Sequence, residues 1–374
     1  MGTSAAALEA ALVHDRFARL RAAADRAGVS AVVVTPGSDL RYLLGVGGSS
    51  FERLTCLVVP TDGAAPVFVS PALEYAGLAG LGLDALGLEV RTWVDGEDPY
   101  RLALAGTDTG RVAVSDLTPV LHAFRLRAAG AVHQVLAGPV LRELRMRKDP
   151  AELAQLRLAG AAIDRVHARV GEWLRPGRTE AEVGADIAAA IVEEGHAVAE
   201  FVIVGSGPNA ASPHHSVSDR VIGRGELVVV DIGGPLPSGY NSDSTRTYAA
   251  GLAPSAEVAT AYAALQAAQQ ASVDAVRPGV TCEAIDEAAR SVLREAGLDG
   301  YFIHRTGHGI GLDVHEEPYI VAGNDLLVEP GMTFSIEPGV YLPGLWGARI
   351  EDIVAVTETG VERFNTRPTD LVVV

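Results

Sequence analysis

The first part of the chain alternates short apolar runs with amphipathic segments. Residues 15–28 place Phe17, Leu20 and Ala24 on one face of a helix with about 3.6 residues per turn. Short apolar runs bounded by turn residues predict strands at 30–34, 55–60, 65–70 and 111–117. Strands that alternate with helical segments favour an α/β domain.

The hydrophobic pattern changes near residue 142. A charged stretch is followed by a long segment with helical periodicity, and Asp149 and Pro150 stand at its start. An aspartate that accepts backbone N–H groups and a proline in the first position are typical of a helix N-terminus. We therefore predict two domains, 1–142 and 143–374, with a helix opening the second.

The second domain contains an internal repeat. Residues 173–195 match 275–297, and each segment has Arg-Pro-Gly-x-Thr followed by a helical pattern. Further on, the strand-like segment 225–233 matches 331–339 at a nearly constant offset. Matches that occur in the same order favour a duplicated α/β unit whose two halves face each other.

Four carboxylates occupy equivalent places in the two halves. Asp231 aligns with Glu337, each after an apolar strand, and Asp243 aligns with Glu351 on the next strand. Carboxylates gathered in a low-dielectric interior either become protonated or recruit cations. An oxygen-rich site with one imidazole suits two divalent ions about 3.5–4 Å apart. His308 is the candidate imidazole.

Each acid also has a simpler interpretation. Acids at strand ends commonly form turns, and Asp243 in NSDST could cap one. Glu351 shares a strand face with Arg349, and such a neighbour often makes a plain ion pair. The duplication favours the joint site, because chance does not place surface acids at equivalent points of two halves.

Histidines cluster in two glycine- or serine-rich segments. The segment HRTGHGIGLDVHE holds His304, His308 and His315. The spacing of the first two could suggest a zinc-binding helix, but the glycines between and after them favour a turn. His214 and His215 lie in the equivalent polar loop of the first half. The remaining histidines are expected to be structural.

Composition limits the classes of function. The net charge is −17, with 47 acids against 30 bases, which argues against a nucleic-acid partner. Cys56 and Cys282 can form neither a disulfide framework nor a cysteine metal site. The N-terminus lacks a signal-peptide pattern, and no apolar run approaches the roughly 18 residues of a membrane span. We expect a soluble cytoplasmic protein with no membrane partner.

With these motifs, the chain resembles the pita-bread metallopeptidases, specifically the Xaa-Pro dipeptidase (prolidase) and aminopeptidase P branch. The resemblance covers essentially the whole chain and rests on DIG…GYNSDSTRT, GHGIGLDVHE, SIEPGVY and ARIED, in this order. The loop between the two aspartates is slightly longer than is usual in the family. The resemblance implies a C-terminal pita-bread fold of two pseudo-twofold-related halves, preceded by a smaller α/β domain of creatinase type.

The same resemblance implies a ligand set for two divalent metal ions per subunit. The five ligands would be Asp231, Asp243, His308, Glu337 and Glu351. Manganese is the expected metal, with cobalt, zinc or iron as alternatives, because all tolerate such ligands. Glu337 would also shuttle a proton from the attacking water.

Residues around the ligands acquire roles by resemblance too. His315 would stabilise the developing oxyanion, His214 would lie near the substrate, and His304 would flank the proline pocket. Arg349 would orient the carboxylate that bridges both metals. Tyr240 would line the pocket.

The implied activity is hydrolysis of the Xaa-Pro bond in short proline-containing peptides by a homodimer. A dedicated pocket is plausible, because proline lacks the N–H that other peptidases bind. The chain's modest length favours a dipeptidase, with aminopeptidase P as the alternative. A metal-free creatinase-like hydrolase and a non-catalytic binding protein share the fold, but the intact ligand set argues against both.

Overall fold

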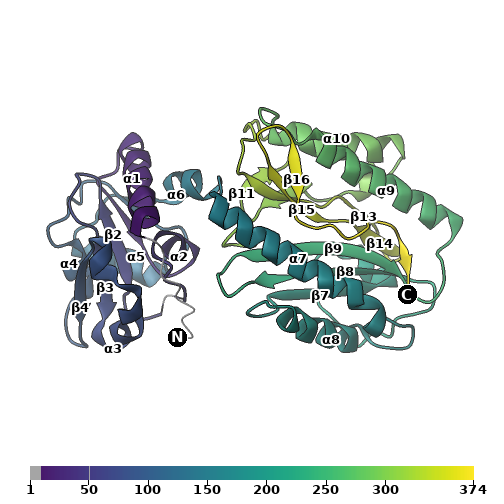
Figure 1. The fold of residues 1–374 in the computed structure, drawn as a ribbon, viewed down its shortest axis with the longest axis horizontal. Coiled ribbons are helices and arrows are strands. Elements are labelled where there is room, and N and C mark those ends of the chain that lie inside the picture. The colour runs from purple at the N-terminus through teal and green to yellow at the C-terminus, as the bar shows by residue number, and fades with distance from the viewer. Residues whose placement is uncertain (1–9, 50) are drawn as a thin grey trace. The chain divides into compact units, whose positions relative to one another are not determined.

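The computed structural model describes residues 10–49 and 51–374 of the chain. The chain forms two compact units, Met1–Arg145 and Met146–Val374, each with its own sheets and helices (Figure 1). The boundary that the sequence suggested, between residues 142 and 143, lies a few residues before this division and stays a prediction. Residues 1–9, which open the segment without a signal-peptide pattern, lie outside the described residues.

The N-terminal unit is built on one mixed sheet of six strands in the order β4-β3-β2-β1-β5-β6. Its strands are β1 (Ala31–Val34), β2 (Cys56–Pro60), β3 (Val67–Pro71), β4 (Glu89–Trp93), β5 (Val112–Val114) and β6 (Gln134–Leu136). Its α-helices are α1 (Ala10–Arg26), α2 (Ser38–Leu44), α3 (Ala72–Tyr75), α4 (Pro99–Leu104), α5 (Val120–Ala129) and α6 (Gly138–Arg145). Two short 3₁₀ segments, Ala76–Leu81 and Leu83–Leu86, follow α3.

The predicted strands of this unit are its four inner ones. Strands β1, β2, β3 and β5 have only buried residues. The sequence analysis missed β4 and β6, which form the two edges of the sheet and consist largely of exposed or half-buried residues. An edge strand that faces solvent lacks the apolar run from which strands were predicted.

The C-terminal unit contains two larger sheets and two pairs of long helices. Its helices are α7 (Pro150–Trp173), α8 (Glu180–Glu193), α9 (Ala256–Ala275) and α10 (Cys282–Glu295). The first sheet, in the order β17-β9-β8-β7, consists of β17 (Val372–Val373), β9 (Asn241–Ala249), β8 (Leu227–Pro235) and β7 (Phe201–Ser206). The second, in the order β11-β10-β12-β15-β16, consists of β11 (Glu316–Ile320), β10 (Gly307–Gly309), β12 (Thr333–Ile336), β15 (Asp352–Val356) and β16 (Val361–Arg363). A hairpin of β13 (Gly339–Leu342) and β14 (Trp346–Arg349) completes the strands, and two 3₁₀ segments are Gly207–Ala211 and Asp299–Tyr301.

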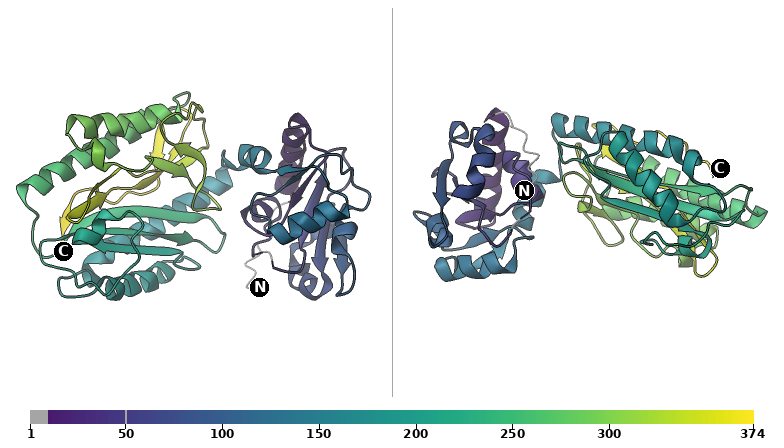
Figure 2. Two further views of the ribbon diagram at one scale, coloured as in Figure 1. Left: turned by 180° about the vertical axis from the view of Figure 1, so that it is seen from behind. Right: turned by 90° about the horizontal axis from the view of Figure 1, so that it is seen from below.

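Each sheet of this unit is covered by its own helix pair. Figure 1 shows α7 and α8 over β7, β8 and β9, and it shows α9 beside α10, as does the left view of Figure 2. Apolar side chains of α7 and α8, among them Ile163 and Ile187, pack on Val228 and Val230 of β8. This burial on one face leaves the other face of each sheet for the polar residues described below.

The duplication predicted from the sequence is confirmed in the fold. Thr179 and Thr281, from the two Arg-Pro-Gly-x-Thr segments, are the N-caps of α8 and α10. Each threonine also makes an isolated antiparallel bridge, Thr179 to Val221 and Thr281 to Leu327. The two halves therefore share their helix pairs, their caps and their bridging contacts.

The predicted start of the long helix is also confirmed. Asp149 Oδ1 accepts hydrogen bonds from the backbone N–H groups of Ala151 and Glu152, at 2.8 and 2.9 Å. The Glu152 carboxylate in turn accepts from the Asp149 N–H, which completes a capping box. This arrangement satisfies N–H groups that the first helical turn leaves without partners.

His167 joins α7 to β9 in the interior. Its Nε2 lies 3.1 Å from the Ser244 carbonyl and its Nδ1 lies 3.0 Å from the Tyr248 hydroxyl, so the neutral ring satisfies both partners. Burial, and then the positive charge of Arg246, lower the pKa of His167 to about 3 from 6.5. Between about pH 6.5 and pH 3, His167 therefore binds a proton in the unfolded chain but not in the folded chain.

The free energy of unfolding is accordingly expected to fall as the pH drops from about 6.5 toward 3, by at most about 1.4 kcal/mol per pH unit from this group. His167→Gln removes the titrating ring, so its stability should depend less steeply on pH than that of the wild type. Urea unfolding at several pH values in the presence of chelator measures the slopes. The exposed His133→Gln is the control and should keep the wild-type slope. Parallel curves for wild type and His167→Gln would contradict this assignment.

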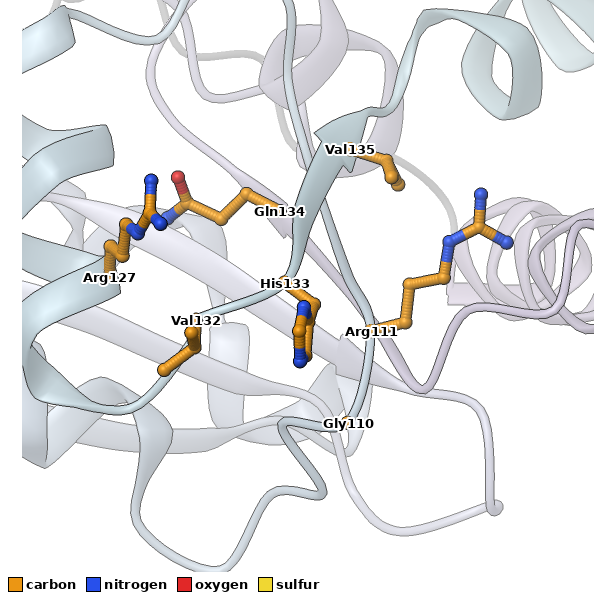
Figure 3. Close-up of a pocket in the computed structure, with 7 residues that line it drawn as sticks. All are labelled: Gly110, Arg111, Arg127, Val132, His133, Gln134 and Val135. Atoms are coloured by element: carbon orange, nitrogen blue, oxygen red, sulfur yellow. The ribbon is translucent and has the colours of Figure 1, made fainter.

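A cavity of about 610 Å³ lies at the β6 edge of the N-terminal sheet (Figure 3). Arg111, Arg127 and His133 line it together with Gln134, so its polar groups are mainly basic or neutral. Arg111 donates a hydrogen bond to the Ala27 carbonyl. None of the residues predicted for metal binding or catalysis lines this cavity.

None of the helices in the described ranges is long and apolar enough to cross a membrane.

Candidate metal centre and active site

The β8–β9 hairpin brings the two aspartates to one face of a sheet. In its antiparallel register Asp231 lies opposite Thr245, and Asp243 lies opposite Gly233. Residues two apart on a strand share a face, so Asp231, Asp243 and Thr245 point to the same side. Both aspartates are buried. The two acids are thus neighbours across the ladder, and not merely residues of a turn.

His308 lies in the strand β10, between two glycines, and not in a helix. A Cβ atom at Gly307 would lie 1.9 Å from the Ser335 carbonyl oxygen, and one at Gly309 would lie 2.3 Å from the Glu317 carbonyl oxygen. Only glycine allows this close approach of β10 to its neighbours. The His308 Nδ1 lies 3.1 Å from the Gly309 carbonyl, so an Nδ1–H bond there directs Nε2 toward the acids.

Glu337 and Glu351 flank the second sheet. Glu337 follows β12 directly, and its Oε1 accepts a hydrogen bond from the Ser335 hydroxyl at 3.0 Å. Glu351 stands between β14 and β15, where its backbone N–H donates to the Thr245 carbonyl of the first sheet. Its Oε2 accepts from the Thr245 hydroxyl at 2.7 Å. This contact joins the two halves at the site.

The five residues predicted as ligands come together. His308 Nε2 lies 3.2 Å from Glu337 Oε1 and 3.6 Å from Asp243 Oδ2. Potential ligand atoms lie within 4.8 Å of one another in three groups: Asp231–Asp243–Glu351, His308–Glu337–Glu351 and Asp243–His308–His315. Because two of the groups share Glu351, the arrangement can hold two adjacent cations. The third group also makes His315 a potential ligand.

The buried carboxylates of the cluster create an electrostatic environment that favours bound cations. Burial raises the pKa of Asp243 and of Glu351 well above the usual range, and repulsion by neighbouring carboxylates adds to this. Burial acts in the same sense on Glu337, but the hydrogen bond with His308 and nearby positive charges outweigh it, and its pKa is about 2. Carboxylates that repel one another in a dry interior are stabilised by bound cations.

Two buried oxygens identify where such cations would bind. Asp231 Oδ1 and Glu351 Oε1 have no hydrogen-bond partner among the described residues. Leaving a buried carboxylate oxygen without a partner is costly, and metal coordination removes that cost. Carboxylates with one imidazole suit manganese, cobalt, zinc or iron. The residues present therefore fit a pair of divalent ions.

The contacts of Arg349 differ from the expectation. Its Nη2 donates to Asp231 Oδ2 at 2.6 Å, and its Nε donates to the Thr245 hydroxyl at 3.1 Å. Arg349 thus reaches Glu351 only through Thr245, whereas its direct ion pair is with Asp231. The simpler interpretation, a plain ion pair of Arg349 with Glu351, is wrong because β14 ends at Arg349, so that the two residues are not on one continuous strand. The orienting role expected for Arg349 stays a prediction.

A cavity of about 1030 Å³ opens onto the acid cluster. The predicted residues His214, His304, His315 and Arg349 line it with the five candidate ligands. His315 lies beside His308, with ring centroids 4.0 Å apart. Although His315 is exposed, partial desolvation and then the charge of His308 lower its pKa to about 4. A neutral imidazole at this position can donate an N–H to an oxygen of a bound substrate.

Tyr240 is the predicted pocket residue that the structure does not bring to the cavity. Its side chain is buried with Leu156, Ile310 and Phe364, and its hydroxyl donates to Glu152 Oε1 at 2.9 Å. Tyr240 therefore belongs to the packing between the hairpin loop and α7.

Tyr341 is a site residue that sequence reasoning missed. Its hydroxyl accepts a hydrogen bond from Arg349 Nη1 at 2.8 Å and lies 2.9 Å from His304 Nε2. It thereby links the ion pair with Asp231 to the imidazole that lines the cavity. Burial raises the pKa of Tyr341 to about 12, so the hydroxyl stays neutral. Its position in GVYL offered no polar signal, because a strand tyrosine is more often part of a core.

The loop that carries His214 is attached to a buried carboxylate. Glu180, in the first turn of α8, accepts hydrogen bonds from Ser206, Asn209 and Ser218. His215 Nε2 lies 2.7 Å from Glu180 Oε2. Of the two adjacent histidines, His215 therefore anchors the loop, whereas His214 lines the cavity. The capping pattern at 179–182 indicates a helix start but did not reveal this second role of Glu180.

Comparisons with known proteins agree with this geometry. Residues 154–358 match the metallopeptidase family M24, and residues 16–147 match the creatinase/prolidase N-terminal domain. The chain is 59% identical over 361 residues to a probable dipeptidase PepE of Mycobacterium tuberculosis, covering 96% of each chain. It is 37% identical over 350 residues to the Xaa-Pro dipeptidase of Lactobacillus helveticus, covering 90% of this chain and 92% of the relative.

Solved structures show the same architecture. The crystal structure of dipeptidase PepE from Mycobacterium ulcerans matches with a TM-score of 0.93 at 57% identity, covering 98% of this chain and 99% of the other. The expected architecture, a creatinase-type α/β domain followed by a pita-bread domain, is thereby confirmed. The match to a metallopeptidase family and to relatives named dipeptidase argues against the alternative of a protein that shares the fold but lacks peptidase chemistry. The chain belongs to the M24 family of metallopeptidases.

Proposed function

We propose that the protein hydrolyses the Xaa-Pro bond of dipeptides with the help of two divalent metal ions. The observation that carries the proposal is the convergence of Asp231, Asp243, His308, Glu337 and Glu351 at the floor of one open cavity. Buried oxygens without partners at this floor support cation binding. Relatives named dipeptidase and Xaa-Pro dipeptidase support the substrate class.

The five ligands would be divided between the two sheets. Asp231 and Asp243 would come from the β8–β9 hairpin, and His308, Glu337 and Glu351 from the second half. When bound, such a pair of ions lowers the pKa of a shared water and polarises the scissile carbonyl. We expect manganese, with cobalt, zinc and iron as alternatives.

The remaining steps fall to side chains of the chain itself. Glu337, ionised at neutral pH, would accept a proton from the attacking water and pass it to the proline nitrogen as the C–N bond breaks. His315 would donate an N–H to the carbonyl oxygen as negative charge develops there. Arg349 would hold Asp231 in place, and His214 and His304 would line the substrate side.

Aminopeptidase P activity is the alternative within the same chemistry. Both activities break the bond before proline, and they differ in whether the chain continues after it. The close relatives named dipeptidase favour the shorter substrate. The homodimer and the cytoplasmic location expected from the sequence stay predictions.

One experiment tests the function. Protein stripped of metal with chelator is expected to be inactive, and manganese added back should restore cleavage of Ala-Pro. Rates should be lower for Ala-Pro-Ala and near background for Ala-Ala. Elemental analysis should find two metal ions per chain. Faster cleavage of Ala-Pro-Ala than of Ala-Pro would favour aminopeptidase P. Full activity in chelator would overturn the metal-dependent mechanism.

A further inference from the structure

A buried lysine in the C-terminal unit has no part in the roles described so far. Lys148 directly precedes Asp149, the N-cap of α7, and its side chain is 1% exposed. Lysine is almost never buried to this degree unless it is paired. Its Nζ donates a hydrogen bond to Glu316 Oε1 at 2.7 Å, and the Glu316 side chain is 9% exposed. The ion pair therefore joins the segment that leads into α7 to the first residue of β11.

The backbone of Lys148 is fixed by its own contacts. Its N–H donates to the Gly331 carbonyl at 2.8 Å, and the neighbouring Arg147 forms an isolated antiparallel bridge with Met332. A Cβ atom at Gly331 would lie 2.9 Å from the Lys148 carbonyl oxygen, so the two segments approach closely. The ammonium group is thus carried on an anchored backbone, although the lysine side chain itself is flexible.

Glu316 packs against the turn that ends at His315. Its Oε2 accepts from the Asp313 N–H at 3.4 Å, and the Asp313 carbonyl accepts from the Gly311 N–H at 3.0 Å. A Cβ atom at Gly311 would lie 2.7 Å from Glu316 Oε1 and 3.1 Å from Lys148 Cε. The ion pair therefore lies directly against residues 311–313 and limits how the turn can move.

Glu316 and His315 are neighbours in the chain, but their side chains have different surroundings. The Glu316 side chain is buried on Lys148, whereas His315 is exposed and lines the cavity beside His308. Glu316 also lies opposite Gly309 across β10 and β11. Its backbone is thus tied to the strand of His308 and its side chain to Lys148, which together fix the direction in which the chain enters from His315.

We propose that the ion pair of Lys148 with Glu316 positions His315 for the reaction, by holding the turn 311–315 in one conformation. The proposal rests on the function proposed above, in which His315 donates an N–H to the scissile carbonyl. Lys148 and Glu316 are positioning residues and are not assigned a contact with the substrate. Their loss should act chiefly on kcat, because the donor acts on charge that develops in the transition state.

The test uses Lys148→Met, which keeps an apolar stem of similar length and removes the charge. On manganese-loaded protein, kcat for Ala-Pro is expected to fall by about 10- to 100-fold, the range for a catalytic group displaced by about 1 Å. KM and metal content should change little. In the His315→Ala background the same substitution should have less than about a twofold effect on kcat, because the group that it positions is already absent.

Two further variants complete the experiment. Arg147→Gln is the matched control, because Arg147 is the adjacent residue and its ion pair is with Glu329, so kcat should stay near that of the wild type. Removing one member of a buried ion pair destabilises a protein, because the other charge is left unpaired. The double variant Lys148→Met/Glu316→Gln leaves neither charge. It is expected to recover thermal stability relative to Lys148→Met while kcat remains low.

The outcomes separate this proposal from the proposed function. An equal fold-loss of kcat from Lys148→Met with and without His315→Ala would make the ion pair structural and would overturn the positioning role. Wild-type kcat in the double variant would overturn it as well. So would failure of both Lys148 variants to fold, because the pair would then be a requirement of the fold itself. If the wild type does not cleave Ala-Pro, the proposed function fails and this proposal fails with it.

Discussion

Glu337→Gln is expected to lower kcat for Ala-Pro by about 10²- to 10⁴-fold, the range for loss of a general acid–base group. Glutamine has nearly the same shape and retains an oxygen that can accept from Ser335 and face a cation. It cannot accept a proton from water or deliver one to the proline nitrogen. Because a ligand charge is also lost, metal binding should weaken, so the comparison needs saturating manganese.

Metal content and turnover must be measured on the same sample. The matched control is Glu358→Gln, an exposed glutamate that follows β15 and should leave turnover unchanged. A loss of turnover at full metal content supports the proton-transfer role. Near-normal turnover with two metals bound would exclude it. If turnover falls only in proportion to the bound metal, Glu337 acts as a metal ligand and not in proton transfer.

His315→Ala is expected to cost about 2.7–4 kcal/mol of transition-state stabilisation, or roughly 10²- to 10³-fold in kcat, the range for one oxyanion donor. The imidazole is exposed to the cavity and lies beside His308. Its lowered pKa keeps it neutral, so that it offers an N–H without adding charge to the site in the ground state. The expected defect is therefore in the chemical step, with KM changed little.

The geometry also offers His315 a competing role. Its ring nitrogen lies in a group of potential ligand atoms with Asp243 and His308. Elemental analysis of His315→Ala distinguishes the two roles, because an oxyanion donor can be removed without loss of metal. A variant that loses one metal ion per chain would make His315 a ligand. His133→Ala, an exposed histidine of the N-terminal unit, serves as the control.

The acids of the candidate metal centre could be singled out from the sequence because local patterns mark them. Asp231 follows four apolar residues within β8, Glu337 directly follows β12, and the repeat places them in equivalent positions. The same period-two logic could have found Thr245 and Ser335, each two residues from a candidate ligand and on the same face. Both hydroxyls do donate to a carboxylate of the cluster.

Contacts between segments that are far apart in the chain could not be predicted from the sequence. Arg349 has an acid two residues away, yet it pairs with Asp231, more than a hundred positions earlier. Tyr240 lies between the two aspartates in the sequence, yet its hydroxyl reaches Glu152 on α7. The roles expected for both residues came from the resemblance, and the neighbours of neither residue along the chain reveal these partners. Which partner a side chain meets depends on how the sheets and helices pack, and a single sequence does not specify that.

The origin of the acids in both halves has a consequence for assembly. Asp231 and Asp243 belong to the first sheet, whereas Glu337 and Glu351 flank the second, and the Glu351 N–H reaches across to Thr245. The group Asp231–Asp243–Glu351 takes its ligand atoms from both halves, so a divalent ion can bind there only after the halves have docked. Ions that bind only the docked form stabilise it by mass action. Removing them with a chelator should therefore lower the free energy of unfolding of the C-terminal unit.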